Sequence, residues 1–285
     1  MFDIILQIIV FGTIVSGIWA LVASGFTLIF GVGRMLNFAH GTLFILSAYF
    51  GIILFNAGIN LYISFVLAIL LAGVAGIILY KLCMSPIREH EVMIVIVTLA
   101  TALLVEQVLL QTFGDNSVSF PSLITGIVYI GDLPVSKERI LALALAIIAI
   151  ISLEVFINRT ITGKKINAAS QDMEMATLVG VEVEKIFTLT MFISAVLAGL
   201  GGLLYSQIFA VTPHVAIKSL IYAFAIVILG GLGSIRGSIV ASFIVGYILM
   251  ATIILLGARW SELVMLLTII GILVIKPSGL FGVEE

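Results

Sequence analysis

Charged residues are so scarce in this sequence that it reads as a succession of long apolar runs separated by short polar stretches. Lys, Arg, Asp and Glu make up 10% of its 285 residues, whereas soluble globular chains average about a quarter. A helical run of about 20 apolar residues matches the hydrocarbon thickness of a bilayer. The sequence therefore predicts an all-α polytopic membrane protein, and the mean hydropathy of +1.34 agrees.

Nine apolar segments stand out, and some are too short to cross a bilayer unbroken. They cover residues 4–24, 42–55, 61–80, 92–113, 140–157, 186–208, 220–229, 239–256 and 263–275. Counting them as crossings gives about nine spans, some short or broken, with the N-terminus outside and the C-terminus inside. We expect one transmembrane domain over residues 1–285. Segment 186–208 is expected inside the bundle, because its small residues let helices approach closely in lipid.

The polar stretch Asn158–Lys185, here called the island, is the most densely charged part of the chain. Its four basic and four acidic side chains cannot lie in hydrocarbon, so it must lie in water. Its basic residues place it in the cytoplasm by the positive-inside rule. Ala169, Met173 and Ala176 recur at helical spacing, which predicts one short helix with an apolar face of small residues. We expect that face to dock against a partner.

Two glycine-bounded polar turns, Gly31–Gly41 and Gly230–Gly237, occupy corresponding places in the two halves of the chain. Broken helices expose backbone groups that only protein or a water-filled cavity can satisfy, so paired interruptions indicate a transport pathway. The pathway candidates are Asn37, His40, Gly41, Thr42, Gly231, Gly233 and Ser234. For Asn37 and His40, hydrogen bonding to exposed backbone is the favoured alternative to ligand binding.

Few ionisable residues interrupt the apolar segments. Glu106 lies deep in its segment, and we expect it to form one polar patch with Gln107 and Gln111. The patch can serve as an interhelical hydrogen-bond cluster, which we favour, or as pathway lining. Arg34 and Arg236 lie in the two turns, where each can attract an anionic solute or a lipid phosphate.

No enzyme motif is complete in the sequence. Gly163-Lys164-Lys165 lacks the upstream glycine and the following Ser or Thr of a P-loop. The zinc-protease pattern beginning at His90 and the dinucleotide fingerprint beginning at Gly231 are also incomplete. A formal net charge of −2 gives no basic field for nucleic acid. We therefore expect no enzyme activity, no catalytic residue, no metal site and no cofactor in this chain.

Five stretches at both ends and in the middle of the chain are jointly specific. They are GFTLIFGVGRMLNFAHGTLF (25–44), SPIRE (85–89), GKKINAASQDMEMATLVGV (163–181), GGLGSIRGS (230–238) and KPSGLFG (276–282). Together they resemble the membrane-spanning permease of bacterial branched-chain amino acid ABC importers, the smaller of the two paired permeases.

The resemblance implies an ABC importer permease bundle in the bacterial cytoplasmic (inner) membrane. Its implied partners are a second permease, two ATPase subunits that hold ATP and Mg, an extracytoplasmic solute-binding protein and membrane lipid, with no nucleic acid. It also implies that the island is the coupling helix that docks in the ATPase. The residues expected at that contact are Ala168, Ala169, Asp172, Met173, Ala176 and Gly180.

Several alternatives stay open. The resembling family also serves urea, short amides and other small polar solutes, and either two identical or two different permeases can form the core. Arg236 stands where the family usually has proline, and Thr42 where an acidic residue is common. The rival hypothesis is an ion-coupled secondary transporter that uses Glu106 as a proton or cation site. We expect segment Gly114–Glu138 to contact the solute-binding protein and His214 to be solvated.

Overall fold

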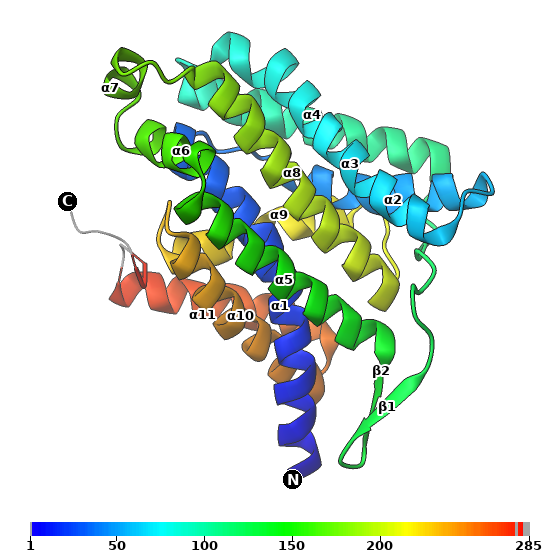
Figure 1. Ribbon diagram of the computed structural model, residues 1–285. Helices are drawn as coiled ribbons and strands as arrows, with labels where there is room; N and C mark the ends of the chain where they lie inside the picture. The colour runs from blue at the N-terminus through cyan, green and yellow to red at the C-terminus, as the bar shows by residue number, and fades with distance from the viewer. Residues whose placement is uncertain (1, 277–278, 282–285) are drawn as a thin grey trace.

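A computed structural model describes residues 2–276 and 279–281, and an α-helix covers each of the nine predicted apolar segments apart from Tyr80 and Leu256 at the ends of two of them (Figure 1). Within these described residues, six helices are long and apolar enough to cross a membrane: α1 (Phe2–Gly33), α3 (Leu61–Leu79), α4 (Glu91–Phe113), α5 (Lys137–Arg159), α8 (Val183–Ile208) and α10 (Ile235–Leu255). Three shorter helices are α2 (His40–Asn56), α9 (Val215–Gly230) and α11 (Ser261–Ile275). The predicted count of about nine thus comprises six full-length and three short helices.

Helices α1 and α8 form the centre of the bundle. α1 packs against α10, α8 and α5, and α8 also packs against α2 and α3. A Cβ atom on Gly202 would overlap the carbonyl oxygen of Phe44, so glycine is what allows α8 and α2 to approach this closely. Most of α8 is buried, which confirms the prediction that segment 186–208 is an interior helix.

The chain turns back into the bundle between α1 and α2. α1 runs into the predicted first turn as far as Gly33, and Arg34 ends it with a left-handed backbone (φ 50°). The Arg34 N–H donates to the Phe30 carbonyl at 2.8 Å. Further on, the Phe38 N–H donates to Thr98 Oγ1 of α4 at 3.1 Å. A backbone carbonyl of α1 and a side chain of α4 thus satisfy backbone groups that a broken helix would leave unpaired in lipid.

A π-helical turn (Tyr80–Met84) and a 3₁₀ turn (Ser85–Ile87) continue α3 toward α4, and a 3₁₀ turn (Ala258–Trp260) precedes α11. Segment 114–138 contains an antiparallel hairpin that we did not predict, formed by β1 (Ile127–Ile130) and β2 (Leu133–Ser136). Four-residue strands are too short for a clear period-two pattern. The Gly131-Asp132 pair between them is a two-residue hairpin signal that could have revealed it.

The two ends of the bundle are distinct. The hairpin and the start of α1 lie at one end, and the island lies at the other (Figure 1). Nine of the 13 Lys and Arg residues belong to the island end, namely Arg34, Lys81, Arg88, Arg159, Lys164, Lys165, Lys185, Arg236 and Lys276. The positive-inside rule therefore makes the island end cytoplasmic.

Candidate functional site

The island forms two helices, not the single helix that we predicted. α6 covers Ile161–Gln171 and α7 covers Met173–Leu178. Asp172 lies between them with an extended backbone (φ −153°, ψ 110°), and its carboxylate accepts a hydrogen bond from the Met175 N–H at 3.0 Å. Aspartate is a strong N-cap, so Asp172 ends α6 and starts α7.

The residues expected at the coupling contact divide between the two faces of α6 and α7. Ala169 and Ala176 are only 2% and 3% exposed, and Ala168 and Met173 are half-buried against the bundle. Gly180 is exposed and follows α7 with a left-handed backbone (φ 83°). This chain's own helices thus already cover the small-residue face that we expected to dock in a partner.

The opposite face of α7 leaves large apolar side chains in water. Met175, Leu178 and Val179 are 61%, 79% and 78% exposed. They lie at the cytoplasmic end of the bundle, beside charged residues that hold this segment outside the hydrocarbon. We call these three residues the α7 edge. Apolar side chains gathered in this way mark an interaction surface.

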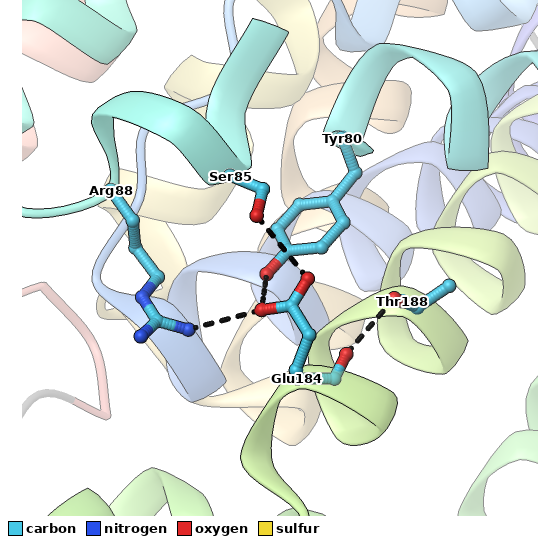
Figure 2. A network of polar contacts seen from close by, with 5 residues as sticks. All are labelled: Tyr80, Ser85, Arg88, Glu184 and Thr188. Atoms are coloured by element: carbon cyan, nitrogen blue, oxygen red, sulfur yellow. Dashed lines mark hydrogen bonds and ion pairs between the residues drawn. The ribbon is translucent and has the colours of Figure 1, made fainter. Parts of the chain in front are cut away.

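The carboxylate of Glu184, at the start of α8, joins the end of the island to the connection between α3 and α4 (Figure 2). It accepts hydrogen bonds from Tyr80 Oη at 3.0 Å, Ser85 Oγ at 3.2 Å and Arg88 Nη1 at 3.3 Å. The Arg88 guanidinium also lies over the Phe187 ring, 5.2 Å from its centroid. We call these five residues the Glu184 cluster. It contains the serine and arginine of the SPIRE stretch.

The second turn joins α9 to α10 and lies against the end of α1. Gly231 and Gly233 have left-handed backbones (φ 100° and 86°), which glycine adopts without strain. Ser234 is the N-cap of α10, where its Oγ accepts from the Gly237 N–H at 3.0 Å. A hydrogen bond of 2.5 Å between Thr27 Oγ1 and Ser238 Oγ joins α10 to α1. These contacts start α10 and hold it against α1.

Arg236, at the start of α10, pairs with Glu154 of α5. Its Nη2 and Nε atoms donate to the same carboxylate oxygen at 2.8 Å and 3.2 Å. The partner is thus neither the anionic solute nor the lipid phosphate expected for Arg236, and no local pattern indicates a carboxylate 82 residues away.

The described part of the C-terminal tail closes the end of α9. The N–H groups of Leu280 and Phe281 donate to the carbonyls of Leu229 and Gly230 at 2.8 Å and 3.1 Å. These carbonyls belong to the last turn of α9 and lack partners within the helix. Part of the KPSGLFG stretch thus caps a short helix with backbone hydrogen bonds.

Asn37 and His40 are 1% and 0% exposed and make internal contacts. Asn37 Oδ1 accepts from the Ala39 N–H at 3.0 Å, and His40 Nε2 lies 3.0 Å from the Val22 carbonyl oxygen. His40 Nδ1 lies 3.5 Å from Ser194 Oγ of α8. These contacts are of the kind that we favoured for both residues.

Gly41 and Thr42 open α2. A Cβ atom on Gly41 would overlap the Ala216 carbonyl oxygen, so Gly41 lets α2 approach the first turn of α9. Thr42 is 3% exposed, and its Oγ1 has no hydrogen-bond partner among the described residues. It borders an open apolar pocket of about 220 Å³ that residues of α2, α3 and α4 line. Of the seven pathway candidates, Thr42 is the residue that lines this pocket.

The predicted polar patch on α4 does not form. Glu106 is 7% exposed and faces α9, where its Oε1 lies 2.6 Å from His214 Nδ1. Gln107 and Gln111 are exposed on other sides of the helix. His214 is partly solvated as expected, with its side chain 58% exposed, but no local pattern indicates that it pairs with Glu106.

Comparisons with known proteins identify the family of this chain. The family described as branched-chain amino acid transport system / permease component matches residues 8–273. LivH of Salmonella typhimurium, a high-affinity branched-chain amino acid transport system permease protein, is 26% identical over 96% of this chain and 94% of LivH. BraD of Pseudomonas aeruginosa, named in the same way, is 24% identical over 98% of this chain and 96% of BraD.

PsaBC from Streptococcus pneumoniae, solved in complex with Fab, has the same fold with a TM-score of 0.55 and 14% identity, over 95% of this chain and 92% of that chain. The family match covers the bundle from α1 nearly to the end of α11. The chain therefore belongs to the branched-chain amino acid transport system permease family of ABC transporters, and it is a multi-pass inner-membrane protein.

Proposed function

We propose that this chain is the permease subunit of an importer for branched-chain or related small amino acids, and that α6 and α7 couple it to ATP hydrolysis in partner subunits. The α7 edge supports this proposal most directly, because it presents large apolar side chains to the cytoplasm. The proposed complex has a second permease, two ATPase subunits with ATP and Mg, and an extracytoplasmic solute-binding protein. No bond in the solute is made or broken.

The contacts between the island and the bundle suggest how a displacement of α7 reaches the membrane-spanning helices. α6 packs against α1, α5 and α8, and α7 packs against α8. The Glu184 cluster ties α8 to the connection between α3 and α4. A force on α7 would therefore act on α1, α8 and α3 together. ATP must bind the ATPase subunits with different affinity in the two arrangements of the complex, since a ligand shifts an equilibrium only by that difference.

Reconstitution tests the proposed function. Leucine uptake into proteoliposomes that hold the complete complex should require ATP and the solute-binding protein. This chain alone, given a proton gradient, should take up none. Proton-driven uptake by the isolated chain would favour the ion-coupled secondary transporter instead.

Neutralising the carboxylate of the Glu184 cluster should weaken coupling without dissociating the complex. Arg88 and Glu184 side chains are 39% and 54% exposed, so the ion pair contributes only about 0.5 kcal/mol. Glu184→Gln should still lower ATP-driven uptake about threefold to tenfold, because α8 loses several charge-assisted contacts to the α3–α4 connection.

The matched control for this prediction is Glu182→Gln, since Glu182, the N-cap residue of α8, pairs with Lys185 in the first turn of that helix. We expect it to transport at the wild-type rate. Equal uptake by the two variants, with the ATPase subunits still bound to both, would contradict a coupling role for the Glu184 cluster.

The hairpin is our candidate contact for the solute-binding protein. All four residues of β1 are exposed, including Ile127 at 59% and Tyr129 at 69%, at the extracytoplasmic end of the bundle. Replacing residues 127–136 with a Gly-Ser linker should abolish stimulation of ATP hydrolysis by the binding protein and leave ATPase copurification intact. Normal delivery of solute by this variant would end the idea.

A further inference from the structure

An open pocket of about 300 Å³ lies between α4, α9 and α11 at the extracytoplasmic end of the bundle. α4 contributes Glu106, α9 contributes Lys218 and Tyr222, α11 contributes Glu262, and His214 precedes α9. The pocket thus combines acidic and basic groups from three helices that are distant in the sequence.

Glu106 is the buried polar group of this pocket. Its side chain is 9% exposed, and only Oε1 is bonded, to His214 Nδ1. Oε2 has no hydrogen-bond partner among the described residues. Leaving a buried carboxylate oxygen unpaired is costly, so the site favours a donor or cation from outside the chain.

Lys218 supplies the opposite charge. It forms an ion pair with Glu262, and its Nζ lies 5.9 Å from the centroid of the Tyr222 ring. The Lys218 and Glu262 side chains are 41% and 56% exposed. Exposed ion pairs contribute little net stability, so Lys218 can exchange Glu262 for the carboxylate of a ligand at small cost.

The rest of the pocket is apolar. Ile217 and Ile221 line it from α9, and Met265 and Leu266 line it from α11. An acceptor for a cation, a donor for an anion and an aliphatic wall together complement an α-amino acid with a hydrocarbon side chain. A simple metal cation would leave Lys218 and the wall unused, and a simple anion would meet the charge of Glu106.

We propose that this pocket binds a zwitterionic aliphatic amino acid from the extracytoplasmic side. The α-ammonium binds the Glu106 carboxylate, which must rotate to expose its buried Oε2; the α-carboxylate binds Lys218 Nζ, and the side chain lies against Ile221 and Met265. The inference rests on the proposed import function and adds a substrate site to it.

Leucine binding to the purified complex of permeases and ATPases, without the solute-binding protein, tests the site. The wild-type complex should bind radiolabelled leucine, and neither 4-methylpentanoate, which lacks the ammonium, nor 3-methylbutylamine, which lacks the carboxylate, should compete. Glu106→Gln and Lys218→Gln should each weaken leucine affinity about tenfold or more, because each removes a charged hydrogen-bond partner. Thermal melting of the variant complexes checks that they are folded.

The matched control is Glu91→Gln, the same change at the exposed start of α4, which should keep affinity within about twofold of wild type. Wild-type affinity in both pocket variants, or equal competition by the two analogues and leucine, would overturn the proposal. ATP-driven uptake by the same preparation separates the two claims. Normal uptake without leucine binding rejects the pocket alone, whereas loss of ATPase association and uptake in the wild type rejects the import function as well.

Discussion

Placing two negative charges on the α7 edge should uncouple the permease from its motor. In the double variant Leu178→Glu, Val179→Glu, we expect ATPase copurification to be lost and ATP-driven uptake to fall on the order of 100-fold or more. Apolar anchors at the centre of an interface commonly contribute about 2 kcal/mol or more each, and two buried carboxylates add a desolvation cost. Both side chains are more than three-quarters exposed, so the fold should tolerate the change.

Thr177→Glu is the matched control for the α7 edge. Thr177 is also exposed on α7 but lies on a different side of the helix from Leu178 and Val179. We expect this variant to retain the ATPase subunits and most of the uptake. If the double variant also retained both, the α7 edge would not be the docking surface.

A side chain at Gly202 should destabilise the bundle more than any other substitution considered above. In Gly202→Val, the new Cβ would overlap the Phe44 carbonyl oxygen, and backbone at a helix crossing cannot move aside as a side chain can. Forcing α2 and α8 apart should cost about 3 kcal/mol or more. Thermal melting of the detergent-purified protein should show a large fall in melting temperature, and less protein should reach the membrane.

Gly271→Val, in α11, is the control for this prediction. A Cβ atom on Gly271 has no neighbour within 4 Å, and both substitutions change helix propensity by the same amount. The difference between the two variants therefore isolates the crossing of α2 and α8. Similar melting temperatures would show that this close approach does not limit stability.

The helices were predictable because their formation depends on local hydrophobicity. Each apolar segment became a helix, and the small residues of segment 186–208 marked the central helix α8. A helix must satisfy its own backbone in lipid whatever surrounds it, so a local pattern is sufficient. The position of the island depends in the same way on its own charges.

The buried faces of the helices and the pairing of distant side chains were not predictable from local patterns. The spacing of Ala169 and Ala176 is visible in the sequence, but which face of α6 and α7 is buried depends on α1 and α8. Both ion pairs, Arg236 with Glu154 and Arg88 with Glu184, join residues more than 80 positions apart.

Among the candidate site residues too, local features were predictable and long-range pairs were not. Glu106 stood out because an ionisable residue in an apolar segment is rare. Its partner His214, 108 residues away, follows only from the packing of α4 beside α9. The seven pathway candidates lie in or beside turns that interrupt helices, and the side chains of Asn37, His40 and Ser234 make hydrogen bonds within the chain. An interruption in a helix creates unpaired backbone groups, and nearby polar residues satisfy those groups first.

Site-specific crosslinking at Leu178 tests the central claim most directly. Cys83 is the only cysteine in the sequence, so Cys83→Ala provides a background for Leu178→Cys. We predict that this variant, in the assembled complex, crosslinks to an ATPase subunit, and that the yield differs between the ATP-bound and nucleotide-free states. An assembled complex that hydrolyses ATP but gives no crosslink at position 178 in either state would contradict the account.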